Sequence, residues 1–261
     1  MSILDQIVAD KIKEVAHRKS IFPTNYWEAS PLFDRSGFSL ATKLRSQTAG
    51  IIAEHKRRSP SKQNINQSLS VTEVAQGYEK AGASGMSVLT DGKYFGGSLE
   101  DLVQARSVTH FPLLRKEFII DEYQLIEAKA HGADVVLLIA AVLSTQEIKQ
   151  LSTTAKSLGL EVLLEVHNEA ELKKSLMPTL DLLGVNNRNL KTFEVSLETS
   201  KNLADKIPND FVKVSESGIS KVEAIQELIR YGYQGFLIGE QFMKSDDPGE
   251  AAKIFIKHLI S

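Results

Sequence analysis

Cysteine is absent from this 261-residue chain, which excludes disulfides, a thiolate nucleophile and a cysteine-based zinc site. Long apolar runs are also missing, and the longest, 135–143, is too short to cross a bilayer. The formal net charge of −2 gives no overall signal for nucleic acid or a membrane surface. The six histidines lack metal-ligand spacing. We therefore expect a cytoplasmic protein without a nucleic-acid, membrane or metal partner. The sequence does not decide the oligomeric state, and we take a monomer as the expectation.

One pattern recurs along the chain, in which a charged, helix-like segment ends in glycine and a short apolar run follows. Clear examples are "EKAGASGMSVLT", "AKAHGADVVLLIA", "KSLGLEVLLEVH" and "IRYGYQGFLIGE". Glycine just past a helix end is a common C-terminal cap, so each segment predicts a helix followed by a strand. Four more strands are predicted at "AGIIAEHK", "FPLLRKEF", "TLDLLGVNN" and "NDFVKVSES", and helices at 71–81, 121–131, 144–158 and 221–231.

Eight alternating strand–helix units with nearly continuous apolar strands predict a parallel (β/α)8 barrel over residues 49–261, within a single domain of residues 1–261. An open doubly wound sheet is the alternative, but no G-x-G-x-x-G follows the first strand. Residues 1–48 form a helical extension that begins with an amphipathic segment. The extension either plugs the amino-terminal end of the barrel or covers the other end, and the sequence leaves both open.

Polar residues follow the predicted strands where barrel enzymes carry their catalytic groups. In "GIIAEHKRRSPSKQNIN", for example, Glu54 and Lys56 share one face of a buried strand. Such lysine–glutamate sets are either structural ion pairs or an acid–base site. The convergence of several such charged residues at one barrel mouth favours an acid–base site. If the residues served stability alone, apolar side chains at these positions would usually be at least as stabilising. The strand-end residues are Glu54, Lys56, Lys116, Glu165, Asn186, Arg188, Glu216, Ser217, Gly239 and Glu240.

Two glycine-containing turns, "KVSESGIS" and "FLIGEQF", indicate phosphate binding. Backbone N–H groups at such turns bind anions, and barrels often bind phosphate after strands seven and eight. Gly218 and Gly239 occupy these positions, and Lys56, Ser59 and Arg188 could add positive charge or a hydroxyl.

Taken together, "IIAEHKRRSPS", "LTDGKYFGGS", "LLRKEFIID", "LLEVHNEAEL", "LLGVNNRNL", "VSESGI" and "LIGE" resemble, in order and spacing, the motifs of the indole-3-glycerol phosphate synthase family. The resemblance covers about residues 50–243 and implies a phosphorylated anthranilate-sugar substrate. It implies that 1-(2-carboxyphenylamino)-1-deoxyribulose 5-phosphate closes its ring and loses carbon dioxide and water, without metal or organic cofactor.

The resemblance also implies roles for individual residues. Lys116 resembles the principal general acid and Glu165 its partner base or proton relay. Lys56 resembles the lysine that meets the substrate carboxylate or a developing oxyanion, and Glu54 the carboxylate that orients Lys56. The other implied substrate contacts are Asn186, Arg188, Glu216, Ser217, Ser59, Phe118 and Phe95, and the implied phosphate contacts are Lys56, Ser59, Gly218, Gly239 and Glu240.

Glu240 is expected to offer only its backbone N–H to the phosphate, with the side chain turned away, because a carboxylate would repel the anion. Three alternatives remain open at this point. They are a phosphate-sugar isomerase of amino-acid biosynthesis, a lyase of the tryptophan synthase α type, and a non-catalytic phosphate-binding barrel.

Overall fold

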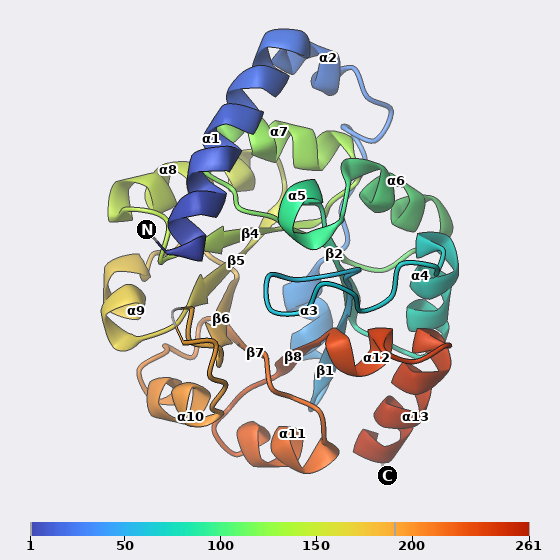
Figure 1. Ribbon diagram of the computed structural model, residues 1–261. Coiled ribbons are helices and arrows are strands. Elements are labelled where there is room, and N and C mark those ends of the chain that lie inside the picture. Colours follow the sequence, from blue (N-terminus) through green and yellow to red (C-terminus); the bar gives the residue numbers. More distant parts are fainter. Residues whose placement is uncertain (1, 191, 261) are drawn as a thin grey trace.

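Eight parallel strands pair in chain order and close on themselves as a barrel (Figure 1). The structure is a computed structural model that describes residues 2–190 and 192–260. The strands are β1 Gly50–His55, β2 Gly85–Leu89, β3 Leu113–Lys116, β4 Val135–Ile139, β5 Glu161–Val166, β6 Leu182–Asn186, β7 Val212–Glu216 and β8 Gly235–Ile238. The (β/α)8 barrel and its eight predicted strands are confirmed.

Helices surround the barrel, and each of the four predicted from the sequence begins and ends within two residues of its expected bounds. Within the described residues, none of the helices has the length and apolar character needed to span a membrane. The helices after the first strand are α4 Val71–Lys80, α5 Gly92–Phe95, α6 Leu99–Val108, α7 Glu122–Ala130, α8 Thr145–Ser157, α9 Glu169–Ser175, α10 Glu198–Ala204, α11 Val222–Ile229, α12 Glu240–Met243 and α13 Pro248–Ile260.

The glycines predicted to end helices adopt a left-handed backbone. Gly82, Gly132, Gly159 and Gly232 have φ values of +86°, +85°, +72° and +84°. Only glycine takes this conformation without steric cost, so the chain turns sharply from each helix into the next strand.

Strand alternation decides which side chains enter the barrel. On β5, Leu163 packs in the apolar cluster inside the barrel, whereas Leu164 packs outward against the helices. Glu165 therefore shares the inward face with Leu163, because every second residue of a strand points the same way. The same argument turns four strand-end residues inward, namely Glu54, Lys116, Glu165 and Glu216.

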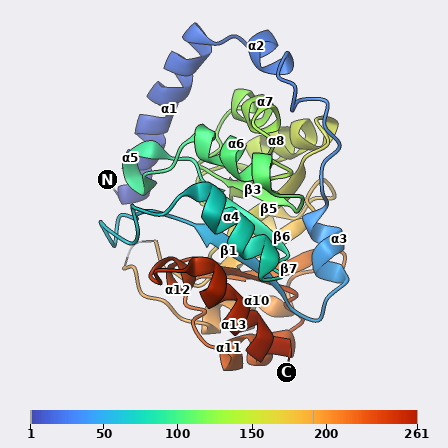
Figure 2. The ribbon, with the colours of Figure 1, turned by 90° about the vertical axis from the view of Figure 1, so that its right-hand side faces the viewer.

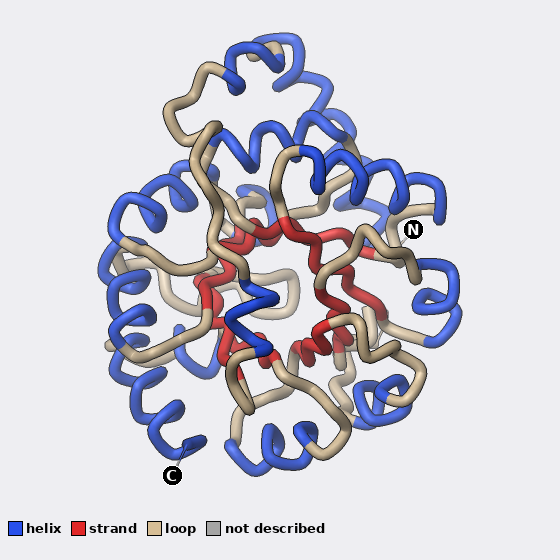
Figure 3. Tube along the Cα trace, turned by 180° about the vertical axis from the view of Figure 1, so that it is seen from behind, coloured by secondary structure: helices blue, strands red, loops and turns tan. Residues whose placement is uncertain are grey.

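The amino-terminal extension comprises α1 Ile3–Ile21, α2 Thr24–Glu28 and α3 Leu40–Arg45, and it reaches both ends of the barrel (Figure 2). Helix α3 closes the amino-terminal end (Figure 3). There Leu40 packs against Gly85, and Leu44 packs against Gly50 and Gly235, at the start of three strands. Helix α1 lies over the opposite end, where its first residues line the mouth. The expected plug at the amino-terminal end is confirmed for α3 (Figure 3). The lid stays a prediction, although Ile3, Leu4 and Ile7 of α1 line the mouth.

Helix α1 buries a lysine among its apolar residues. Ile7, Lys11 and Val15 lie on the packed face, while Ile12 is 57% exposed. The ammonium of Lys11 lies 2.9 Å from Asp91 and 3.1 Å from Glu117, which follow β2 and β3. Lys11 also pairs with Glu14 on its own helix at 2.8 Å. The buried contacts still hold the helix at the mouth, because moving α1 away would take the ammonium from Asp91 and Glu117.

Candidate active site

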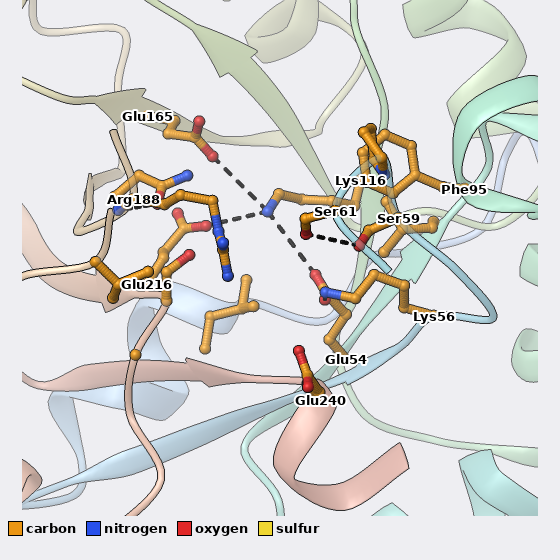
Figure 4. A pocket seen from close by; sticks show the side chains of 18 of the residues that line it. Glu54, Lys56, Ser59, Ser61, Phe95, Lys116, Glu165, Arg188, Glu216 and Glu240 are labelled. Atoms are coloured by element: carbon orange, nitrogen blue, oxygen red, sulfur yellow. Dashed lines mark hydrogen bonds and ion pairs between the residues drawn. The ribbon is translucent and has the colours of Figure 1, made fainter. Parts of the chain in front are cut away.

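A cavity of about 460 Å³ opens at the carboxyl ends of the strands (Figure 4). This volume suits a small-molecule ligand. Every site residue predicted from the sequence lines this one cavity: Glu54, Lys56, Ser59, Phe95, Lys116, Phe118, Glu165, Asn186, Arg188, Glu216, Ser217, Gly218, Gly239 and Glu240.

Lys116 lies at the centre of the site, between three carboxylates from three other strands (Figure 4). Its Nζ is 3.0 Å from Glu216 Oε2, 3.7 Å from Glu165 Oε2 and 3.8 Å from Glu54 Oε2. Burial alone would lower the pKa of Lys116, but the charges of Glu216, Glu165 and Glu54 outweigh burial and raise it. Lys116 is therefore held as an ammonium ion.

Glu54 and Lys56 form an ion pair of 2.7 Å at the end of β1. Burial would raise the pKa of Glu54, but Lys56 and Lys116 lower it below its usual value. Gly239 leaves the space for this carboxylate, since a Cβ at that position would lie 2.5 Å from Glu54 Oε1. A glycine predicted only as a phosphate contact thus also shapes the acid–base part of the site.

Glu165 and Glu216 both face Lys116, yet their pKa values are shifted in opposite directions. Burial would raise the pKa of Glu165, but the adjacent His167 and Lys116 lower it to about 2. Burial raises the pKa of Glu216 to about 7, and the charge of Lys116 offsets this only in part. A pair of carboxyl groups with separated pKa values is typical of a site that needs both a base and a proton donor.

Sequence reasoning missed His167, which lies just after β5. Its Nε2 is 3.2 Å from Glu165 Oε1, and its Nδ1 is 3.1 Å from Glu171 Oε2. Two signals were present in "EVHNEAE": Glu165 and His167 are two residues apart, so they share a face, and Glu171 lies one helical turn beyond.

The turn after β7 has a strained backbone. Ser217 and Gly218 have φ values of +68° and +77°, and a turn of this kind can present backbone N–H groups to an anion. Asn187 Nδ2 donates a hydrogen bond to the carbonyl of Ser217 and holds the turn in place. Asn187 is buried and was not predicted from the sequence.

Glu240 lies at the rim, where its side chain meets the loop after β1. Lys62 Nζ donates a hydrogen bond of 2.8 Å to Glu240 Oε1, and this contact lowers the pKa of Glu240. Both side chains are about half exposed. The pair joins the β1 loop to α12 at the rim of the cavity.

An apolar wall completes the mouth. The rings of Phe95 and Phe118 lie 6.0 Å apart at 39°, and both line the cavity.

Within the described part of the chain, no group of three or more histidine, aspartate or glutamate side chains could hold a metal ion.

A (β/α)8 barrel with a lysine–carboxylate cluster and an anion-binding turn at its carboxyl-terminal mouth defines a barrel enzyme acting on an anionic small molecule. The model of the indole-3-glycerol phosphate synthase family matches residues 4–255. The indole-3-glycerol phosphate synthase of Bacteroides thetaiotaomicron is 47% identical over 257 residues, or 98% of both chains. That of Polynucleobacter asymbioticus is 44% identical over 258 residues, covering 95% of this chain and 97% of the relative. The chain belongs to the indole-3-glycerol phosphate synthase family.

More distant solved structures share the fold. A chain of the tryptophan synthase complex from Pyrococcus furiosus has a TM-score of 0.59 at 18% identity, covering 81% of this chain and 97% of that one. N-(5'-phosphoribosyl)anthranilate isomerase from the same organism has a TM-score of 0.56 at 14% identity, covering 81% and 98%. At these identities the likeness shows the barrel alone.

Proposed function

We infer that this protein is an indole-3-glycerol phosphate synthase, a carboxy-lyase of tryptophan biosynthesis. It converts 1-(2-carboxyphenylamino)-1-deoxyribulose 5-phosphate to indole-3-glycerol phosphate, carbon dioxide and water. The observation that carries this inference is the set of three carboxylates around Lys116, in a chain that matches its family over nearly its whole length.

The reaction needs both an acid and a base. The ring carbon that bears the carboxylate attacks the ketone carbon, and the ketone oxygen must gain a proton as its charge develops. Carbon dioxide then leaves and restores the aromatic ring. The new hydroxyl departs as water, and a base removes a proton from the neighbouring carbon to complete the indole.

Lys116 is the proposed acid. Its raised pKa keeps it protonated, and the developing alkoxide is basic enough to take that proton. The same oxygen later leaves as water, so one acid serves both steps if its proton is replaced. Glu216, 3.0 Å away with a pKa near 7, is the proposed source of the second proton.

Glu165 is the proposed base, because it stays ionised and its Oε2 faces Lys116. Lys56, held by Glu54, is proposed to meet the substrate carboxylate, where the positive charge would bind the anion and release it as carbon dioxide forms.

The ends of the substrate fit the ends of the cavity. We propose that the phosphate binds the backbone at Gly218 and Gly239, with the N–H of Glu240 and the side chains of Ser59 and Arg188 nearby. The anthranilate ring would lie against Phe95 and Phe118. Asn186 and Ser217 are the proposed polar contacts between these ends.

We further propose that the protein works as a cytoplasmic monomer without nucleic acid. The net charge of −2 supports the absence of a nucleic-acid partner. Light scattering after size exclusion should give the mass of one chain, 28.9 kDa; twice that mass would contradict the proposal.

The activity is tested by mixing the purified protein with the carboxyphenylamino deoxyribulose phosphate in EDTA. Indole fluorescence and released carbon dioxide are then followed together. We expect equimolar product and carbon dioxide at a rate that EDTA leaves unchanged. Absence of product from a protein whose circular dichroism shows the folded state would refute the proposed function.

A further inference from the structure

His167 does not enter the chemistry proposed above, yet it contacts one of the two carboxylates that face Lys116. It lies one residue beyond β5, and only 9% of its side chain is exposed. Nε2 lies 3.2 Å from Glu165 Oε1, an ion-pair distance without hydrogen-bond geometry, and Nδ1 is hydrogen-bonded to Glu171. A buried imidazole between two carboxylates is held as an imidazolium, since each carboxylate stabilises its positive charge.

The orientation of the ring is fixed by the start of α9. Glu171 Oε2 accepts hydrogen bonds from both the backbone N–H and Nδ1 of His167. Asn168, the N-cap of α9, donates from Nδ2 to the other oxygen of Glu171. His167 is therefore held next to Glu165 by a capped helix.

Glu216 provides an internal comparison. It is as deeply buried as Glu165, and it also contacts Lys116. Its Oε1, however, is buried without a hydrogen-bond partner among the described residues. The two carboxylates thus share one ammonium, and Glu165 has a second cation beside it.

We propose that His167 is a positioning residue that keeps Glu165 ionised, and so decides which of the two carboxylates facing Lys116 serves as the base. Without the imidazolium, Glu165 and Glu216 become two buried carboxylates that depend on the same lysine, and such a pair shares a proton. The base would then be blocked in a large fraction of molecules at neutral pH. The kinetic consequence of this proposal rests on the proposed function. The ion pair between His167 and Glu165 does not depend on that function.

Other charged groups also face Glu165. They are Lys116 from β3, Glu54 from β1 and Glu216 from β7, and the neutral amide of Asn186 from β6 also contacts Glu165. None of these groups is altered by substitution of His167. A shift in the pH dependence of His167→Gln therefore reports on the lost imidazolium.

The kinetic experiment measures kcat and KM of wild type, His167→Gln and Glu171→Gln from pH 5.5 to 8.5. At pH 8 we expect His167→Gln to keep kcat within about threefold of wild type, because Glu165 ionises there without help. At pH 6 its kcat should fall at least about a further tenfold relative to wild type, with KM changed less than threefold. A loss that is equal at all pH values, or no loss, would overturn the proposal.

Two variants separate charge from structure. Glu171→Gln keeps an acceptor for Nδ1 and leaves His167 protonated at pH 6, so its acid-side kcat should match wild type within about twofold. An acid-side loss as large as that of His167→Gln would overturn the proposal, since it would arise from the α9 cap. His131→Gln, which removes a half-buried histidine bound to the carbonyl of Glu127, is the control for histidine loss in general.

A measurement independent of turnover follows the imidazole C–H signals by NMR, with the His167→Gln spectrum identifying the signal. Glu165 and Glu171 raise the pKa of His167 to about 10. Its signal should therefore remain that of an imidazolium at pH 8 in wild type and titrate at lower pH in Glu165→Gln. Titration near 6.5 in wild type would overturn the proposal even if the enzyme is active. An inactive wild type would refute the proposed function alone.

Discussion

The ammonium of Lys116 lies closer to Glu216, at 3.0 Å, than to Glu165, at 3.7 Å. Lys116 on β3 and Glu216 on β7 face each other across the interior of the barrel. The sequence paired Lys116 with Glu165 as acid and base, and the structure adds Glu216 as the nearest carboxylate. Because burial raises the pKa of Glu216 to about 7, this contact joins the proposed acid to a group that holds a proton near neutral pH.

The first prediction concerns the alkaline side of the pH profile. Glu216 is protonated below its pKa of about 7 and loses its proton above it. We therefore expect kcat/KM of the wild type to fall as pH rises through this value, because kcat/KM reports groups of the free enzyme. Glu216→Gln should lack this limb and lose about 100-fold in kcat. An unchanged alkaline limb in the variant would show that another group titrates there.

The second prediction concerns Gly184 on β6. A Cβ at this position would lie 2.5 Å from Glu216 Oε1 and 3.2 Å from Leu163. Gly184→Ala should displace Glu216 from Lys116 and lower kcat at least about tenfold, at a stability cost of roughly 1–3 kcal/mol from overpacking. Gly92→Ala is the control, since the nearest atom to its Cβ would be 3.5 Å away. Steady-state kinetics and urea unfolding of both variants test this, and full activity of Gly184→Ala would refute it.

The third prediction concerns the anchor of α1. Lys11→Ala leaves Asp91 and Glu117 buried without their ammonium partner, and should lower the free energy of unfolding by roughly 3–5 kcal/mol. Lys19 on the same helix pairs with Asp121 in an exposed position, so Lys19→Ala should cost at most about 1 kcal/mol. Urea unfolding of the two variants compares them directly, and equal losses would contradict a buried anchor.

The fourth prediction concerns Glu240 at the rim. Its carboxylate lines the cavity at the end where we propose that the phosphate binds, and it is held by Lys62. Glu240→Gln removes a repulsive charge and frees Lys62, so KM should fall about two- to fivefold with kcat and stability nearly unchanged. The difference should shrink with added salt. Glu250→Gln, which alters an exposed glutamate on α13, is the control; a rise in KM of Glu240→Gln alone would contradict the account.

The barrel fold and the residues that line its mouth could be predicted from local sequence patterns. Glycine caps such as Gly82 end helices by backbone geometry alone, and Lys116 and Glu165 converge because both end strands of one closed sheet. The pattern does not give distances across the barrel. These distances depend on strand register and on which side chain fills the space beside a glycine. Gly184, for example, leaves the space that Glu216 occupies.

Features such as His167 and Lys11 escaped prediction, and the sequence left closure of the amino-terminal end of the barrel as one of two alternatives. His167 lies beyond its strand, and its role depends on a partner in the following helix cap. Lys11 occupies an apolar helix face because two acidic loops reach it from elsewhere in the chain. Helix α3 closes the barrel only because the strands above Leu44 begin with glycine. The contacts of Lys11 with Asp91 and of Leu44 with Gly235 join segments far apart in sequence, whereas the contact between His167 and Glu171 spans only four residues.

The central claim is that Lys116 is the acid of the reaction, and it is tested most directly by single-turnover formation of indole-3-glycerol phosphate by Lys116→Ala. The control is Lys213→Met, which removes a buried strand lysine that faces outward and donates to the carbonyl of Ala204. We expect Lys116→Ala to remain folded by circular dichroism and to form product at least about 10³-fold more slowly than wild type, with Lys213→Met close to wild type. Product formation by folded Lys116→Ala at the wild-type rate would contradict the account.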